Sequence, residues 1–206
     1  AAPQEVTAAQ VCQLSLYVEE RIQTTLDRAA PTAVALGPTL STAQLEHLAH
    51  ALDKRNREWR EEWMDGSPEE RQERRLKKLV ERAEGFYGRL TEVQRQQLQG
   101  QLEASAFDAS VQYREVLRRQ QDTLQTLRVL RNGNATEIHT QAEVRALVAR
   151  SLQSPDPAFR QYTERVRSQA CEAIAAFHNR TSASQRQRLQ DTLKGYEGDV
   201  RALMRP

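Results

Sequence analysis

The sequence Gly66-Ser67-Pro68-Glu69-Glu70 separates two runs of residues with helical apolar periodicity. Gly66 suits the left-handed position that follows a helix, and Ser67 suits the N-cap of the next helix. Pro68 is favoured in the first helical turn, where the N–H that it lacks would have no partner. Glu70 can accept a hydrogen bond from the amide of Ser67 and so complete a capping box. The stretch predicts that one helix ends and another begins here, as a helical hairpin.

Apolar residues recur at three- and four-residue steps on both sides of this turn, which is the period of one helix face. Before the turn the stripe is formed by Leu45, Leu48, Leu52, Trp59 and Trp63. After it the stripe is formed by Leu76, Leu79, Val80, Ala83, Phe86, Tyr87 and Leu90. The Ser/Thr-x-x-Gln/Glu signal also recurs and predicts helix starts at Ser41, Ser67, Thr91, Thr140 and Ser182. We therefore predict an all-α protein, an elongated multi-helix bundle of about eight helices with no sheet.

The N-terminal part of the chain is expected to form a helix of its own. Residues 7–30 carry an apolar face formed by Val11, Leu14, Val18 and Ile22. Two prolines and a glycine interrupt this period between residues 30 and 38, so this stretch is expected to be a linker. We predict an N-terminal helical arm with its Pro/Gly linker over residues 1–37, and a main helical domain over residues 38–206.

The composition argues against several classes of partner. The 206 residues include 30 Lys and Arg and 28 Asp and Glu, a formal net charge of +2, and only 5% are aromatic. This balance argues against nucleic-acid binding. No apolar run approaches the ~20 residues that span a bilayer. The chain begins without a Met or a hydrophobic segment, so we expect a removed signal or a start inside a longer chain, and membrane attachment only through a lipid anchor outside this chain.

No catalytic site can be assembled from the sequence. It contains no Gly-rich phosphate loop, no nucleophile elbow and no paired carboxylates with a recognisable pocket, so we expect neither an enzyme nor a cofactor. His47 and His50 lie three residues apart on one expected helix and would bind a divalent metal only if a third ligand converged. The alternative is two solvated histidines, and we predict no metal site.

Cys12 and Cys171 lie near opposite ends of the chain. They lack the Cys-x-x-Cys spacing of zinc and redox motifs. In an oxidising compartment, one disulfide between them would join the N-terminal arm to the C-terminal half. Two separate buried thiols are the alternative, and the sequence leaves both open.

Two clusters are candidates for contact with a partner. Trp59 and Trp63 lie four residues apart, so they belong either to the packed core or to an exposed aromatic ridge. Arg71, Arg74 and Arg75 form a basic cluster interleaved with glutamates, which indicates either a solvated salt-bridged face or a surface for an acidic lipid or protein. We retain all five residues as possible partner contacts.

Several stretches together are similar to a proteobacterial lipoprotein family known only as a domain of unknown function. The resemblance is carried by residues 40–48, 56–63, 66–71 and 78–84, and by Ala170-Cys171 through His178 with Ser184-Gln185-Arg186 and Gly195. It implies a lipoprotein signal and a further N-terminal segment outside this chain. It also implies a place in the periplasm or cell envelope, and it brings no catalytic residues.

A second resemblance concerns one capping signal. Leu90-Thr91-Glu92-Val93-Gln94 resembles the Leu-Thr-x-x-Gln motif of small periplasmic helical chaperones. Residues 40–44 are a looser copy, and the copy at Ser182 has Thr181 in place of the leucine. The alternative is that these residues are ordinary capping boxes, which stabilise the starts of their helices and have no further function.

We therefore predict a non-enzymatic helical domain of a cell-envelope (lipo)protein, which acts through contacts with unknown protein partners. One alternative is an ATP-independent periplasmic chaperone. The other is a metal-binding protein that uses His47 and His50.

Overall fold

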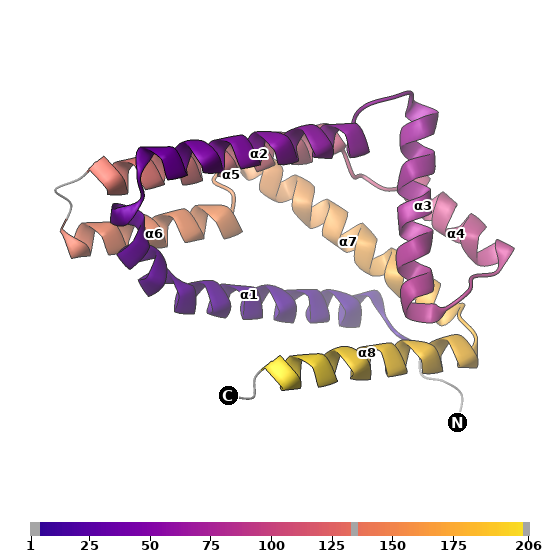
Figure 1. Cartoon of the computed structure of the whole chain (residues 1–206). Coiled ribbons are helices and arrows are strands. Elements are labelled where there is room, and N and C mark those ends of the chain that lie inside the picture. Colours follow the sequence, from indigo (N-terminus) through magenta and orange to yellow (C-terminus); the bar gives the residue numbers. More distant parts are fainter. Residues whose placement is uncertain (1–4, 133–135, 204–206) are drawn as a thin grey trace. The chain divides into compact units, whose positions relative to one another are not determined.

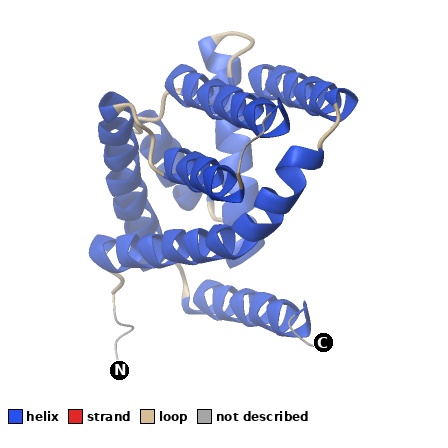
Figure 2. Ribbon diagram, turned by 90° about the vertical axis from the view of Figure 1, so that its left-hand side faces the viewer, coloured by secondary structure: helices blue, strands red, loops and turns tan. Residues whose placement is uncertain are grey.

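The computed structural model of the protein describes residues 5–132 and 136–203. Within these ranges the chain forms eight α-helices and one short 3₁₀ helix, and no strand (Figures 1 and 2). In chain order they are α1 (Ala8–Leu36), η1 (Gly37–Thr39), α2 (Thr42–Trp63), α3 (Pro68–Tyr87), α4 (Glu92–Glu103), α5 (Ala109–Asn132), α6 (Glu137–Leu152), α7 (Pro157–Asn179) and α8 (Ala183–Leu203). The predicted all-α class, with eight helices and no sheet, is confirmed.

The chain divides into two compact units, which we describe one at a time. Unit 1 contains α3, α4 and α8 with the start of α1 and the end of α7; its described residues are 5–12, 67–105 and 167–203. Unit 2 contains the other helices and the rest of α1 and α7; its described residues are 13–66, 106–132 and 136–166. Most of α1 thus shares a unit with α2, and the expected division after residue 37 stays a prediction.

In unit 1, α3 packs against both α4 and α8. Buried Leu90, Leu98 and Phe177 form the core. The side chains that surround them are Leu76, Leu79, Val80, Ala83 and Tyr87, all from α3. They belong to the apolar stripe that the sequence predicts, so this part of the core follows from helical periodicity.

In unit 2, α5 packs against α2, α6 and η1. Leu130 on α5 is only 1% exposed, and it lies so close to Gly37 that a Cβ there would be 2.9 Å from its Cδ1. Because a side chain at residue 37 would meet this buried leucine, the close packing of η1 on α5 depends on a glycine. The other buried apolar side chains of the unit are Leu45, Val144, Phe159 and Tyr162.

Four of the five predicted capping boxes are present. At Ser41, Ser67 and Thr91 the cap side chain accepts a hydrogen bond from the amide three residues on, and the side chain there accepts one from the cap amide. At Ser182 the two bonds to Gln185 measure 2.9 and 3.2 Å. Gly66 has a φ of 90°, as expected for the residue that follows a helix.

The fifth predicted start is wrong. Helix α6 begins after Thr136, whose side chain accepts a hydrogen bond of 3.3 Å from the amide of His139. Thr140 lies inside the first turns, is buried, and donates to the carbonyl of Thr136 at 3.3 Å. Thr136 lacks the Gln or Glu partner of the signal, since His139 stands three residues after it, and it caps the helix without a capping box. A further box at Thr7 and Gln10 opens α1, with bonds of 2.8 and 3.2 Å.

The linker expected between residues 30 and 38 is also wrong. Helix α1 continues through Pro31 to Leu36, and η1 follows directly. A proline inside a helix removes one backbone hydrogen bond and bends the helix without always ending it. The last part of α1 turns away from the direction of its longer part (Figure 1). The proline therefore bends this helix and does not end it.

Candidate functional site: two exposed apolar helix faces

Helix α8 carries an apolar seam that the rest of the structure leaves open. The seam consists of Leu189, Leu193, Tyr196, Val200 and Leu203, which follow one another at steps of four and three, the a and d positions of a heptad repeat. Leu193 is 50% exposed, Tyr196 and Val200 are each 54% exposed, and Leu203 is 86% exposed. We call these five residues the α8 seam.

The rest of unit 1 contacts this helix from its start as far as Tyr196. The capping box at Ser182 opens it, and α3 packs against it. Tyr196 meets Phe86 of α3 edge-on, with ring centroids 6.3 Å apart. Over its described length, 183–203, α8 has no buried residue. The rest of unit 1 therefore contacts the seam as far as its middle residue, Tyr196, whereas Val200 and Leu203 beyond it are more than half exposed.

A second open apolar face lies on α1. It is formed by Leu14, Tyr17, Val18 and Ile22, and the exposed fractions of these side chains run from 48 to 63%. The guanidinium of Arg21 lies 4.7 Å from the centre of the Tyr17 ring, in cation–π contact. Across residues 8–36 this helix buries no side chain. We call these four residues the α1 face.

The N-termini of α4 and α8 are joined in unit 1 by a reciprocal pair of glutamines. Gln94 donates to Oε1 of Gln185 at 2.8 Å, and Gln185 donates to Oε1 of Gln94 at 3.0 Å. Gln94 also donates to the carbonyl of Arg180 at 3.4 Å, and Gln185 to that of Arg89 at 3.2 Å. Each Oε1 accepts a second bond, from the amide of its own helix cap. All hydrogen-bonding positions of both side-chain amides are thus used.

Tyr87 and His178, also in unit 1, are in contact. The Tyr87 hydroxyl lies 3.0 Å from Nδ1 of His178, and Tyr87 meets Phe177 edge-on at 5.5 Å between ring centroids. Burial, followed by the nearby charge of Arg186, lowers the pKa of His178 below its ordinary value. Burial raises the pKa of Tyr87. Folding therefore favours the neutral form of both side chains.

The start of the chain is attached to the end of α7 in two ways. Cys12 and Cys171 form a disulfide that links positions 159 residues apart, and Cys171 is buried. Asn179 accepts a hydrogen bond from the amide of Val6 and donates one to its carbonyl, both at 2.9 Å. Of the two states that the sequence leaves open for these cysteines, the structure contains the disulfide.

Unit 2 contains a buried carboxylate, Glu115 on α5, whose side chain is 4% exposed. Arg118 donates to both of its oxygens at 2.8 Å, and Arg119 donates to one of them at 2.8 Å. Ser154, in the turn after α6, donates a further bond of 3.1 Å. Burial by itself raises the pKa of Glu115, but these donors outweigh it, so the pKa lies below its ordinary value.

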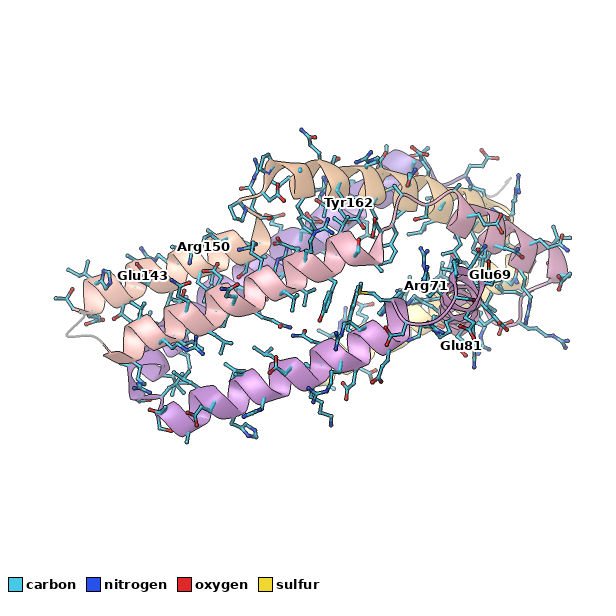
Figure 3. All side chains as sticks on the ribbon, turned by 90° about the horizontal axis from the view of Figure 1, so that it is seen from above. Glu69, Arg71, Glu81, Glu143, Arg150 and Tyr162 are labelled. Carbon is cyan, nitrogen blue, oxygen red and sulfur yellow. A yellow bond between two sulfur atoms is a disulfide. The ribbon has the colours of Figure 1, made fainter. Side chains whose placement is uncertain are left out.

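The same cluster joins α5 to α6. Arg150 on α6, labelled in Figure 3, donates to the two oxygens of Asp122 at 2.8 and 2.9 Å. Arg118 donates to the backbone carbonyl of Arg150 at 2.9 Å. The hydrogen bonds from Arg150 lower the pKa of Asp122 despite its partial burial. The charges are paired with one another, so this cluster acts as a structural clamp between the helices.

The two tryptophans lie against α5 in unit 2. Trp59 stacks on Tyr113 with ring centroids 5.2 Å apart and the planes inclined by 13°. Trp63 lies 6.2 Å from Trp59 and 5.8 Å from Phe107, measured between centroids. Both are half-buried. They contribute to the packing of α2 on α5, and a role for their exposed edges in partner contact stays a prediction.

The three arginines proposed as partner contacts lie on α3. Arg71, Arg74 and Arg75 are half-buried, and Figure 3 shows Arg71 with Glu69 and Glu81 on the same helix. Half-buried arginines can pack through their aliphatic stems while their guanidinium groups remain hydrated. Their role toward a partner stays a prediction.

The metal hypothesis for His47 and His50 requires a third side chain beside them. His47 and His50 are exposed on α2. Within residues 5–132 and 136–203, no group of three or more His, Cys, Asp or Glu side chains is placed to hold a metal ion. The third ligand that the metal hypothesis needs is therefore not supplied by the described part of the chain.

Sequence reasoning missed the glutamine pair and the clamp around Glu115. The Gln94–Gln185 pair had a signal, because Arg89 to Gln94 and Arg180 to Gln185 both read Arg-x-Ser/Thr-x-x-Gln. This repeat indicates two similar helix caps, but it does not indicate that the side chains of Gln94 and Gln185 contact each other. The sequence contains no comparable signal for Glu115, because this residue lies in a polar stretch of a long helix and nothing local marks it as buried.

Comparison with known families adds one finding. The model of the family of unknown function DUF6279 matches residues 1–156. The chain belongs to DUF6279. The match covers α1 to α6 and ends before α7. No curated protein and no solved structure matches this DUF6279 chain. Among the helices described, none is both long and apolar enough to cross a membrane.

Proposed function

We propose that this DUF6279 chain is a non-enzymatic helical protein of the cell envelope that acts by binding other proteins. The observation that carries the proposal is that two long helices leave their apolar faces open to solvent, on the α1 face and the α8 seam. An amphipathic helix gains its stability mainly by burying the apolar face. Contiguous exposed apolar residues with polar neighbours are typical of surfaces that bind a partner.

Two observations support the compartment. The Cys12–Cys171 disulfide fits an oxidising environment such as the periplasm, because cytosolic thiols are kept reduced. The resemblance to envelope lipoproteins points to the same place. A lipid anchor outside these residues would attach the domain to a membrane.

Site-specific photo-cross-linking in the native cell tests this proposal. A photoreactive amino acid replaces Tyr17 on the α1 face or Tyr196 on the α8 seam, and Gln187, an exposed polar residue of α8, serves as the matched control. We expect discrete protein adducts at Tyr17 and Tyr196 and none at Gln187. Adducts that are equally abundant at all three positions, or absent from both apolar faces, would refute protein binding by these helices.

An ATP-independent chaperone is the second candidate, because exposed apolar faces can bind the apolar segments of unfolded clients. We expect near-stoichiometric amounts of the protein to suppress aggregation of denatured clients without ATP. The double variant Leu14→Gln, Val18→Gln should lose this effect, because it removes apolar surface from exposed positions and leaves the core intact. Lack of suppression with several unrelated clients would remove this candidate and leave specific protein binding in place.

A further inference from the structure

We propose that the α8 seam receives a single amphipathic α-helix of a partner protein, whose positions flanking its own apolar stripe carry lysine or arginine. This inference rests on the proposed function and names the chemistry of the partner. It follows from three features of α8: the spacing of its apolar residues, the exposure of its C-terminal part, and the charges beside the seam.

The spacing selects a helix as the occupant. With Leu193 and Val200 at a positions, Leu189, Tyr196 and Leu203 fall at d positions. Three consecutive d positions with two a positions between them form the seam that one helix presents to another in a coiled coil. An isolated exposed leucine would need no explanation, but a five-residue seam at this spacing matches the surface of a second helix.

The exposed fractions show which part of the seam is open. Tyr196 packs against Phe86 of α3 on one side and is still 54% exposed. Val200 and Leu203, which follow it, are 54% and 86% exposed. We call the last nine residues of α8, 195–203, which carry these three side chains, the extension.

This extension is a weak helix by itself. It contains Gly195 and Gly198, and a Cβ added at either position would meet no neighbour within 4 Å. Glycine in a helix interior disfavours the helix, and neither packing nor a close approach requires it here. Burial of the seam under a partner helix would supply the stabilisation that the extension lacks.

The flanking charges specify the partner further. Among the described residues, the e and g positions beside the seam hold Gln190, Thr192, Glu197 and Asp199, so they contain two carboxylates and no cation. Glu197 also pairs with Arg201 at the neighbouring b position, an exposed ion pair at the helix surface. Oppositely charged e and g residues set partner choice in coiled coils. A second copy laid antiparallel on the extension would bring Glu197 and Asp199 close to their own counterparts, which like-charge repulsion disfavours. Carboxylates at the edge of the seam also disfavour an anionic lipid surface.

Two synthetic helical peptides test the proposal on the whole, oxidised chain. Both have leucine at a and d over three heptads; one has lysine at every e and g position, and the other has glutamate. We expect the lysine peptide to bind at least about tenfold more tightly in fluorescence anisotropy at physiological salt. Because the chain has a net charge of +2, a general attraction of the basic peptide does not predict this order.

Variants locate the binding. Val200→Gln should weaken binding of the lysine peptide about tenfold, because it places an amide in the buried seam. Gly198→Ala lies at an f position outside the seam and should keep or increase the affinity. Glu197→Lys should reduce the difference in affinity between the lysine peptide and the glutamate peptide. Circular dichroism shows whether each variant retains its helix content.

Three results would overturn the inference. They are equal affinity for both peptides, a concentration-dependent homodimer that Val200→Gln abolishes, and binding to phosphatidylglycerol vesicles through the seam. The proposed function is judged separately, since adducts at Tyr17 on the α1 face would stand even if neither peptide bound α8. Loss of adducts on both helices would count against both.

Discussion

Each unit of the molecule contains an interior polar cluster that joins two helices, and the glutamine pair of unit 1 differs in charge from the Glu115 cluster of unit 2. Unit 1 joins the starts of α4 and α8 through the neutral amides of Gln94 and Gln185. Unit 2 joins α5 to α6 through ionised groups centred on Glu115. Both connect segments that are distant in sequence, and both satisfy their buried polar atoms.

The difference shows two ways to bury polar groups. The amide pair does not change its charge with pH, and its stability depends on the match of donors to acceptors. The ionic cluster must keep its carboxylates charged, and it must overcome the cost of removing them from water. We therefore expect the glutamine pair of unit 1 to be sensitive to geometry and the Glu115 cluster of unit 2 to be sensitive to charge.

The largest effect should come from the disulfide, whose two cysteines both belong to unit 1. The double variant Cys12→Ser, Cys171→Ser removes a cross-link over 159 residues and should lower the free energy of unfolding by about 3–5 kcal/mol. Hydrogen exchange should accelerate in α3, α4 and α8 before it does in α2, α5 and α6. Equal loss of protection in both sets of helices would show that the link does not act locally on unit 1.

Removal of the central charge of unit 2 should have the next largest effect. Glu115→Ala leaves Arg118 and Arg119 without their buried carboxylate and should cost about 2–3 kcal/mol, a value reduced because both arginines are partly hydrated. Tryptophan fluorescence reports this change, since Trp59 and Trp63, the only tryptophans, lie in unit 2. The matched control is Glu197→Ala, which breaks an exposed ion pair with Arg201 and should change stability little. Similar losses in both variants would contradict a clamp.

A charge introduced into the amide pair should destabilise unit 1. In Gln94→Glu the new carboxylate faces Oε1 of Gln185 and no longer donates to the carbonyl of Arg180, which should cost about 2 kcal/mol at neutral pH. Protonation of this carboxylate restores one donor, so the penalty should shrink as the pH falls below about 5. Gln44→Glu is the control, because Gln44 holds the same position in an exposed capping box. If Gln94→Glu and Gln44→Glu lowered the free energy of unfolding equally, the loss would come from the capping box and not from the contact between Gln94 and Gln185.

The smallest effect is a difference in pH dependence between the units. The lowered pKa of His178 means that the unfolded chain binds its proton more readily, so unit 1 should begin to lose stability as the pH falls below about 6.5. The lowered pKa values of Glu115 and Asp122 place the corresponding loss in unit 2 below about pH 4. Hydrogen exchange against pH separates the two steps. His178→Gln should remove the loss of stability in unit 1 and leave the loss in unit 2 unchanged. If the loss in unit 1 persisted in this variant, another titratable group would cause it.

The sequence alone determined the helices and most of their starts. The boxes at Ser41, Ser67, Thr91 and Ser182 each depend on atoms within four residues, and helical periodicity needs only one face of one helix. Local signals failed at Thr140, because Thr136 caps the helix one turn earlier without a Gln or Glu partner, and at Pro31, where the helix bends and continues.

Only the tertiary structure decided which apolar stripes are buried and which polar residues meet. The stripe of α3 became a core, whereas those of α1 and α8 stayed exposed, although all three show helical spacing. Gln94 and Gln185 lie 91 residues apart, and the two cysteines 159 residues apart. Such pairings depend on how distant segments pack, and the free energy of that packing is shared over many contacts that no local pattern records.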